Sequence, residues 1–235
     1  MVKVSCISAT PQPKKVIAAG VLNMRGDMRH SLDDISDAEA DEIFAEMQKT
    51  ALNGVFEWIT LVFQVDGVSR AFTHQAVRHR VGFSYSQESM RFTKIEDMDV
   101  VCGPSVKTNE QKAIWNETMK GLENAYRMLI DSGVETQDAR GVLPTNVVTR
   151  IGIGTNYRAL VGLAGDRLCL QAQGEWREVI RQMKSEVRRV WGDDFADYMQ
   201  PVCEHEHRCK FESVFDRPCP LQKKWNSIDD FDDCK

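Results

Sequence analysis

The chain has 235 residues, of which 42% are hydrophobic and 28% are charged, as in ordinary globular proteins. Its formal net charge of −5 argues against a nucleic-acid binder. No apolar run approaches the roughly 20 residues of a membrane-spanning helix, and the first residues resemble a strand and not a secretion signal. The seven cysteines are odd in number and scattered, which fits reduced thiols, so we expect a cytoplasmic protein with no membrane partner.

The first part of the chain predicts strands and helices in alternation. Hydrophobic spacing predicts a strand over 2–8, a short helix over about 14–23 and an amphipathic helix over 37–52. The run of β-branched and aromatic residues over 56–65 predicts a second strand. A turn signal at 66–67 would end it.

A helix over 68–77 would then deliver a basic segment at its C-terminal end, followed by an extended or looping stretch over 84–92. The 3.6-residue period over 109–132 predicts the clearest helix, which Gly133 would end. We expect three of its large side chains in the core: Trp115, Met119 and Tyr126.

The last part predicts a strand over 147–153, a short helix over 156–164 and a long helix over 175–191. A helix end at 165–166 would place Arg167 just beyond it. The mixture predicts one α+β catalytic domain over 1–200, with a mixed or antiparallel sheet flanked by long helices, and a tail over 201–235. The Gly-Ile-Gly run at 152–154 lacks the third glycine and the βαβ unit of a Rossmann fingerprint.

The most informative stretch is the basic and polar run over 78–92. It begins with Arg78, His79 and Arg80 and continues with serines, Gln87, a glutamate and a further arginine. Arginine presents a planar fork of donors that fits a phosphate or carboxylate. A solvated basic turn would explain the first three residues alone, but the polar residues after them favour a binding site.

This run resembles the signature of the flavin-dependent thymidylate synthases, which is Arg-His-Arg, seven residues and then Ser, with Gln or Glu two before the Ser and Arg two after it. Gln87, Ser89 and Arg91 take those places. A second similar region contains 139–144, 155–160 and an arginine at 167. The resemblance covers roughly residues 55 to 190.

The resemblance implies an enzyme that methylates dUMP at C5 to give dTMP. Methylenetetrahydrofolate would supply the carbon, and FAD with NADPH would supply the reducing equivalents. The family is a homotetramer with active sites shared between subunits. Its arginine that matches Arg167 ionises the base of the nucleotide, and no cysteine nucleophile is used. The alternative for Arg167 alone is a surface cation at a helix end.

The resemblance also assigns binding residues. The nucleotide would be bound by Gln75, Ala76, Val77, Arg78, Gln87, Glu88, Ser89, Met90, Arg91, Arg140 and Arg167. The flavin would be bound by Arg78, His79, Arg80, Gln87, Asn156, Tyr157, Arg158 and Gly162. We interpret Ser89 as a hydrogen-bonding group, because no paired base is evident for a nucleophile.

Three features depart from the family pattern. Eight residues separate Arg80 from Ser89, and Gly82 could absorb the extra one through an unusual backbone conformation. Leu52 and Trp58 stand where the family has histidines, and the flavin residue at 162 is glycine where asparagine is common. Two alternatives therefore stay open: the same fold acting on another pyrimidine nucleotide such as UMP or adding another C5 group, and a catalytically silent nucleotide-binding protein.

The tail contains residues that suit zinc chemically: Cys203, His205, His207, Cys209 and Cys219. Their spacing matches no zinc motif, so a solvated tail is the favoured interpretation and no metal is predicted. The acidic end over 229–233 is expected to be disordered.

Overall fold

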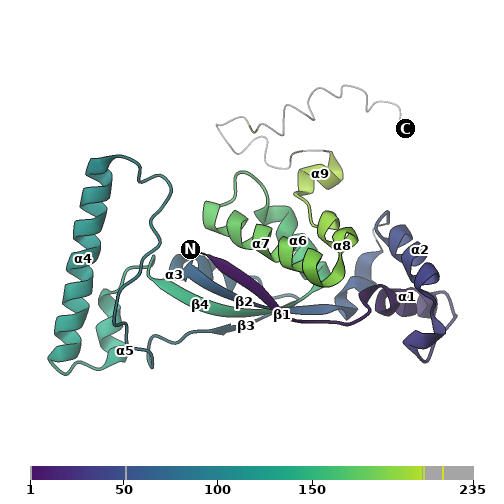
Figure 1. Cartoon of the computed structure of the whole chain (residues 1–235), viewed down its shortest axis with the longest axis horizontal. Coiled ribbons are helices and arrows are strands. Elements are labelled where there is room, and N and C mark those ends of the chain that lie inside the picture. The colour runs from purple at the N-terminus through teal and green to yellow at the C-terminus, as the bar shows by residue number, and fades with distance from the viewer. Residues whose placement is uncertain (1, 51, 208, 210–218, 220–235) are drawn as a thin grey trace. The chain divides into compact units, whose positions relative to one another are not determined.

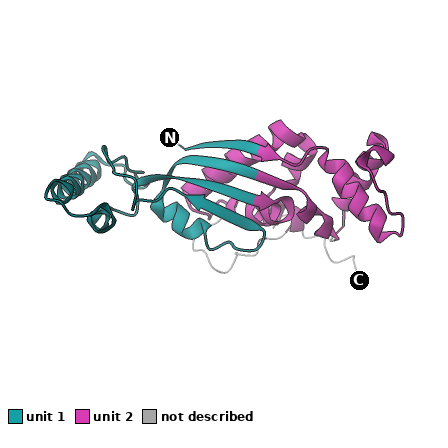
Figure 2. Cartoon of the chain, turned by 90° about the horizontal axis from the view of Figure 1, so that it is seen from below, with its two compact units in different colours: residues 1–7, 62–154 teal, residues 8–61, 155–235 magenta. Residues whose placement is uncertain are grey.

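The computed structural model describes residues 2–50, 52–207, 209 and 219. The chain forms two compact units, each made of two segments (Figure 2). Unit 1 contains Met1–Ile7 and Val62–Gly154, and unit 2 contains Ser8–Leu61 and Thr155–Lys235. The expected division into a catalytic domain and a tail at residue 201 stays a prediction, and the acidic end lies outside the described residues.

A four-stranded sheet runs in the order β1-β2-β4-β3 (Figure 1). Its strands are β1 (Lys3–Ala9), β2 (Thr60–Ser69), β3 (Phe83–Gln87) and β4 (Val148–Asn156). Helices precede, separate and follow these four strands along the chain, so the predicted α+β class is confirmed. Because β4 lies between β2 and β3, the second sequence region adjoins the strand of the first.

The start and end of β2 differ from the prediction. The 3₁₀ turn η2 (Asn53–Trp58) comes first, and Phe56 is fully buried within it, so this apolar run is satisfied by packing without a strand. The predicted turn at 66–67 is wrong, because β2 continues through it. Gly67 has a φ of 75°, and its N–H donates to the Asp66 side chain. Because glycine adopts this conformation without strain, the strand continues through the position.

Unit 1 contains the helices that follow this sheet. They are α3 (Arg70–Ala76), α4 (Asn109–Asp131), α5 (Thr136–Ala139) and the 3₁₀ turn η3 (Arg140–Val142). The Ser69 hydroxyl caps α3 by accepting from the Phe72 N–H at 3.0 Å. A capping box between Thr108 and Gln111 starts α4, and Gly133 at φ 91° follows its end as predicted.

Helix α4 is amphipathic but is hardly covered by its own chain. Tyr126 is its one buried residue, and this core prediction is confirmed. Trp115 and Met119 are only partly covered, so the prediction of a fully buried face is wrong for them. Ile114 is 61% exposed and Met128 is 72% exposed. The hydrophobic period predicts the helix, but it does not say whether the same chain covers the apolar face.

Unit 2 contains the remaining helices. They are α1 (Pro13–Met24), η1 (Leu32–Asp34), α2 (Asp37–Met47), α6 (Tyr157–Arg167), α7 (Gly174–Trp191), α8 (Asp193–Tyr198) and α9 (Val202–Glu206). Phe195 is central to their core, with ring centroids 4.3 Å from Phe44, 5.3 Å from Tyr157 and 5.1 Å from Trp191. Aromatic rings of this size bury much of the apolar surface that stabilises such a unit.

Two helix ends in unit 2 correct the predictions. Helix α2 ends at Met47, so Leu52 lies outside it and is 72% exposed. Helix α6 continues through Gly165 to Arg167, which is its last residue and does not lie beyond its end. A Cβ added at Gly165 would lie 3.0 Å from the Val202 side chain, so this glycine permits close packing and does not end the helix.

The glycines of β4 have a similar packing role. A Cβ at Gly154 would lie 2.5 Å from the Ser84 hydroxyl of β3, and one at Gly152 would contact Ser86. They belong to a sheet strand and form no phosphate-binding turn, which agrees with the rejection of a Rossmann site. Along the described part of the chain, no helix is long and apolar enough to cross a membrane.

Two helical glycines allow a closely packed position to be compared with an open one. A Cβ at Gly20 of α1 would lie 2.9 Å from the Val55 side chain and 3.3 Å from the Trp58 ring, whereas one at Gly121 of α4 would meet nothing within 4 Å. We expect Gly20→Ala to lower the free energy of unfolding by ~1–3 kcal/mol through overpacking. Gly121→Ala should raise it by up to ~1 kcal/mol through helix propensity. Urea unfolding measures both, and a stabilised Gly20→Ala would contradict this packing.

Candidate functional site

In unit 1, the basic segment forms a turn between α3 and β3. Helix α3 ends at Ala76, and the N–H groups of Arg78 and His79 still bond back to its last carbonyls at 3.2 and 3.0 Å. The Tyr85 hydroxyl donates to the His79 carbonyl oxygen at 2.9 Å, which fixes the turn from the strand side. Gly82 has a φ of 75°, so the predicted unusual conformation in the lengthened turn is confirmed.

The cations of this turn face solvent. Arg78 and Arg80 are exposed, and within the described part of the chain neither forms a salt bridge. Burial raises the pKa of the Tyr85 phenol to about 12, and the positive charge of Arg80 opposes this shift. Tyr85 therefore stays protonated near neutral pH and remains a hydrogen-bond donor.

The polar loop after β3 is attached to α3 by two side chains. The Gln87 amide donates to the Thr73 hydroxyl at 2.7 Å, and that hydroxyl donates to the Arg70 carbonyl oxygen at 3.0 Å. The Arg70 guanidinium donates to the Glu88 carbonyl oxygen at 3.3 Å. Thr73 is fully buried, so its hydroxyl sets the position of Gln87 from inside the unit.

A second attachment joins the loop to α5 and η3. Arg91 donates to the side-chain oxygen of Gln137 at 3.4 Å, and Arg140 donates to the backbone carbonyl of the same residue at 3.0 Å. Burial lowers the pKa of Arg70, the charge of Arg140 lowers it further, and the charge of Glu88 opposes the shift. Three arginines thus converge around the loop on neutral acceptors, an arrangement that suits a bound anion.

Other loop residues have structural contacts. The Glu88 carboxylate accepts from the Thr149 hydroxyl at 3.4 Å and lies 3.8 Å from the Arg150 guanidinium of β4. The Ser89 hydroxyl accepts from the Arg91 N–H at 3.4 Å, and its role as a hydrogen-bonding group stays a prediction. The buried side chains of Ala76 and Met90 pack in the unit, so any ligand contact from them would be made by the backbone.

In unit 2, the 155–160 part of the second sequence region forms the start of α6. The Asn156 side chain caps the helix by accepting from the Ala159 N–H at 2.8 Å. Tyr157 is fully buried and donates to the Phe195 carbonyl oxygen at 2.7 Å, so its side chain belongs to the core and is not available to a flavin. Arg158 is exposed and paired with Glu57 at 2.6 Å.

Gly162 and Arg167 lie further along α6. A Cβ at Gly162 would meet nothing within 4 Å, so this position is open on the helix surface. Arg167 is half-buried, and its guanidinium carbon lies 4.8 Å from the centroid of the Trp176 ring. This cation–π contact orients the group, which favours a fixed charge over a solvated helix-end cation.

The two residues that replace the family's histidines are both accessible. Leu52 is 72% exposed and Trp58 is 55% exposed, and both adjoin η2 in unit 2. Single exposed apolar side chains are normal on a protein surface, so this exposure alone marks no site. They offer apolar surface where the resemblance implies polar rings.

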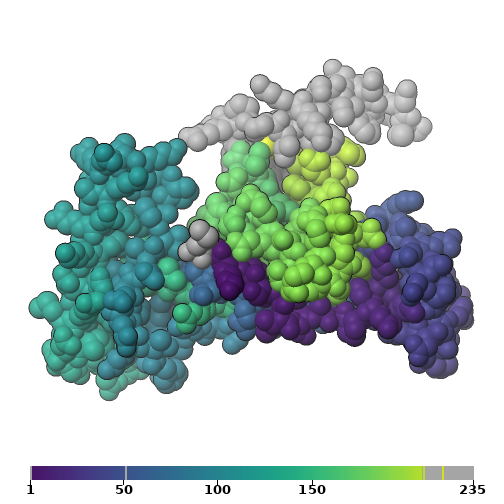
Figure 3. Space-filling view, viewed as in Figure 1, coloured from purple at the N-terminus to yellow at the C-terminus, as the bar shows by residue number. Residues whose placement is uncertain are grey.

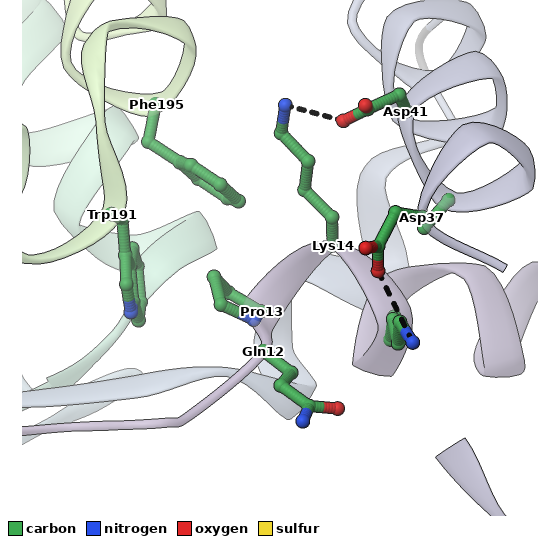
Figure 4. A pocket seen from close by; sticks show the side chains of 9 residues that line it. Gln12, Pro13, Lys14, Asp37, Asp41, Trp191 and Phe195 are labelled. Atoms are coloured by element: carbon green, nitrogen blue, oxygen red, sulfur yellow. Dashed lines mark hydrogen bonds and ion pairs between the residues drawn. The ribbon is translucent and has the colours of Figure 1, made fainter. Parts of the chain in front are cut away.

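A pocket of about 340 Å³ at the start of α1 contains none of the predicted residues (Figure 4). Lys14 reaches Asp41 at 2.7 Å and also pairs with Asp194, while Lys15 pairs with Asp37 at 3.2 Å. The aromatic rings of Trp191 and Phe195 form its opposite wall. Because the lysines are neutralised by carboxylates, we interpret this hollow as a packing feature of unit 2 and not as a ligand site.

The fold and the loop define an α+β protein with a cluster of arginines on unit 1, and comparisons with known proteins give its family. The family described as "Thymidylate synthase complementing protein" matches residues 5–191. The flavin-dependent thymidylate synthase of Clostridium tetani is 30% identical over 221 residues, covering 86% of this chain and 88% of the relative. That of Pyrococcus horikoshii is 35% identical over 196 residues, covering 80% of each.

Two solved structures have the same fold at 17% identity. One is the UMP/dUMP methylase PolB from Streptomyces cacaoi bound with 5-Br dUMP, with a TM-score of 0.68 over 84% of this chain and 94% of the other. The second is Thymidylate Synthase X from Helicobacter pylori with FAD and dUMP, with a TM-score of 0.67 over 85% and 99%. The chain belongs to the flavin-dependent thymidylate synthase family, a family of methyltransferase enzymes.

The contact between Thr73 and Gln87 provides a test of the loop attachment. Thr73→Val keeps the shape but leaves the Gln87 amide without its acceptor at 2.7 Å. We expect a loss of ~1–3 kcal/mol in the free energy of unfolding, the cost of an unsatisfied buried group. Thr73→Ser retains the hydroxyl and should recover most of the loss. A loss in Thr73→Ser as large as that in Thr73→Val would show that the methyl group contributes as much as the hydrogen bond, which would contradict this account.

Proposed function

We propose that this protein methylates dUMP at C5 to give dTMP in the cytoplasm, with methylenetetrahydrofolate as carbon donor and FAD and NADPH as the reducing system. The observation that carries the proposal is the set of arginines around the loop of unit 1. Arg70, Arg91 and Arg140 bond to carbonyl or amide oxygens and, within the described residues, form no salt bridge. Family membership supports the same reaction.

The proposal gives the nucleotide phosphate to this loop. Guanidinium groups bind phosphate through paired N–H donors, and their attraction is strong where no carboxylate competes. Arg91 and Arg140 share Gln137 as acceptor, so their forks are held near one another before a ligand arrives. Such preorganisation lowers the entropy that binding must overcome. Gln75 and Arg78 at the end of α3 would complete the nucleotide contacts.

Arg167 would stabilise the negative charge that develops on the pyrimidine carbonyls when C5 becomes a nucleophile. A fixed cation is effective here because it needs no reorganisation as the charge appears. The contact with the Trp176 ring would supply that rigidity, since the ring is 1% exposed and packed in the core of unit 2. The half-buried setting also lowers the screening of the interaction by water.

The residues assigned to FAD fit an anionic cofactor in part. Arg78 and Arg80 are exposed cations without salt bridges in the described chain, as a diphosphate requires. His79 lies between them, and Arg158 would first have to exchange its Glu57 partner. FAD, when bound, supplies the hydride, and NADPH restores it. The proposal assigns these groups to sites shared between subunits.

A second candidate is the same fold acting on UMP or adding another group at C5. The exposed Leu52 and Trp58 favour it, because the resemblance places the flavin and folate side near them. A change from imidazole to apolar surface alters which ring stacks there and how it is protonated. The fold is also that of a protein named as a UMP/dUMP methylase.

We also propose a homotetramer, supported by the uncovered face of α4 (Figure 3). Ile114 and Met128 are mostly exposed, and Trp115 is only partly covered, on a helix of 23 residues. An amphipathic helix with an uncovered apolar face gains stability by packing against another surface. A second copy of the chain supplies such a surface by symmetry.

The reaction is tested by the visible spectrum of the purified protein under anaerobic conditions. We expect bound flavin that bleaches with NADPH and recovers only when methylenetetrahydrofolate and dUMP are both added. Mass analysis should then find dTMP, and UMP in place of dUMP separates the second candidate. A protein that binds no FAD, or a reduced flavin that neither nucleotide reoxidises, would contradict both.

Arg167→Lys tests the charge on the pyrimidine. It keeps a cation but loses the planar group that lies on Trp176, so we expect kcat to fall ~10²-fold or more, as for loss of a preorganised electrostatic contact. Bound flavin should stay unchanged in amount. Arg181→Lys is the matched control, because Arg181 is an exposed arginine of α7 paired with Glu178. An equal fall in both variants would remove the special role of Arg167.

The tetramer is tested by placing charge on α4. Met128→Glu introduces a carboxylate on the uncovered apolar face, and we expect sedimentation to show dissociation into smaller species. Asn116→Glu, at an exposed polar position of the same helix, should leave the assembly unchanged. A monomeric unmutated protein, or dissociation by both variants, would contradict an interface on this face.

A further inference from the structure

The lengthened turn before β3 closes as a β-turn. The Phe83 N–H donates to the Arg80 carbonyl oxygen at 3.4 Å. Between these residues, Gly82 has a φ of 75°, which the third residue of a type II turn requires and which glycine adopts without strain. Val81, the other central residue of the turn, is 90% exposed. The extra residue of the signature is therefore accommodated in a turn that faces solvent, and β3 starts directly after it.

Three side chains of β3 share the side that faces α3. Phe83, Tyr85 and Gln87 are half-buried, whereas the two serines between them are exposed. Side chains of a strand point alternately to opposite faces, so these three lie on one face. Gln87 bonds to the buried Thr73 of α3 at 2.7 Å, which identifies this face as the one directed towards the helix.

Two of these side chains form a closed set of contacts with His79. The Tyr85 and Phe83 rings are stacked, with centroids 6.2 Å apart and planes 8° apart. The Phe83 and His79 ring centroids are 6.3 Å apart, with an angle of 59° between the planes. Both separations lie in the range of favourable aromatic pairs. The Tyr85 hydroxyl closes the set by donating to the His79 carbonyl oxygen at 2.9 Å.

Tyr85 therefore supports His79 in two ways. Its hydroxyl holds the backbone of His79, and its ring supports the Phe83 ring that lies next to the imidazole. His79 is half-buried, whereas the arginines on both sides of it are exposed. The bond to the His79 carbonyl also limits rotation of the peptide that leads to Arg80. Groups held in this way before a ligand arrives lose less entropy when it binds.

We propose that Tyr85 and Phe83 are positioning residues for the flavin, and that they act by holding His79 in the conformation in which the turn from Arg78 to Arg80 binds FAD. This inference rests on the proposed function, which assigns that turn to FAD. Neither residue is given a contact with the flavin or with the nucleotide. The two residues compensate for the longer turn, because they attach it to the first residues of β3.

The two attachments made by β3 are separate. Tyr85 holds the turn before the strand, whereas Gln87 holds the loop after it. That loop has a further attachment, because Arg91 and Arg140 both donate to Gln137. Loss of the Tyr85 hydroxyl should therefore weaken the binding of FAD and leave the binding of the nucleotide unchanged. A general loss of stability in unit 1 would weaken both.

Tyr85→Phe is the first test, because it keeps the ring and removes only the hydroxyl. We expect the Kd of FAD, titrated into the flavin-free full chain, to rise roughly 3- to 10-fold, as for one lost hydrogen bond. The KM for FAD should rise by the same factor, while kcat at saturating FAD and the KM for dUMP are retained. Tyr126→Phe is the matched control, since the hydroxyl of this buried tyrosine of unit 1 accepts from the Ile95 N–H at 3.3 Å. It should leave the Kd of FAD unchanged.

A second pair of variants tests the ring contacts and serves if Tyr85→Phe fails to fold. Phe83→Leu keeps an apolar side chain but removes the ring between His79 and Tyr85. We expect it to raise the Kd of FAD, because the imidazole loses its neighbour while the hydroxyl bond remains. Phe83→Tyr restores an aromatic ring at the same position and should recover the affinity.

Two kinds of failure can be told apart. An unmutated protein that binds no FAD would overturn the proposed function, and this inference with it. An unmutated protein that binds FAD, together with unchanged affinity in Tyr85→Phe and Phe83→Leu, would overturn the inference alone. So would an equal loss of FAD affinity in Tyr126→Phe, or a rise in the KM for dUMP as large as that for FAD, since either would show a general loss of structure.

Discussion

Repulsion between like charges is the constraint on which the loop of unit 1 depends. Burial lowers the pKa of Arg70, and Arg140 is close enough for its positive charge to lower that pKa further. The Glu88 carboxylate is close enough for its charge to oppose this shift, but among the described residues it forms no salt bridge with either arginine and does not occupy their donors. The chain instead holds these groups with neutral oxygens, from the Glu88 and Gln137 carbonyls. The donors are kept in place while the attraction for an anion is retained.

Two cations of unit 2 are held in the opposite way. Lys14 is shared between Asp41 and Asp194, and Arg188 between Asp193 and Asp197. Exposed pairs of this kind contribute little stability each, but they leave little net field at the surface. Cations paired with carboxylates, such as Lys14 and Arg188, thus differ from the loop arginines, which we propose to bind a ligand. It explains why a hollow lined by two lysines is a poor candidate for an anion site.

The sequence predicted most elements and the signature residues, because periodicity and turn chemistry are local. It could not predict which surfaces cover one another. Gly165 has the same sequence signature whether it ends a helix or allows a close contact, and only the position of Val202 decides. Thr73 and Gln137 were missed for the same reason, since their partners lie 14 and 46 residues away. Tyr157 was assigned to the flavin from its motif, but packing placed its ring in the core.

Helix α6 is supported at both ends by packing against unlike surfaces. At its start, Tyr157 is held by the Phe195 carbonyl inside the aromatic core, and near its end Gly165 fits closely against α9. A helix of 11 residues is about 16 Å long and bends little over that length. The helix is therefore held near both ends as a rigid element, and Arg167 is its last residue. The orientation of the Arg167 guanidinium then depends on the aromatic core that holds the start of α6. A substitution in that core, far from any ligand, would therefore change the direction in which this charge points.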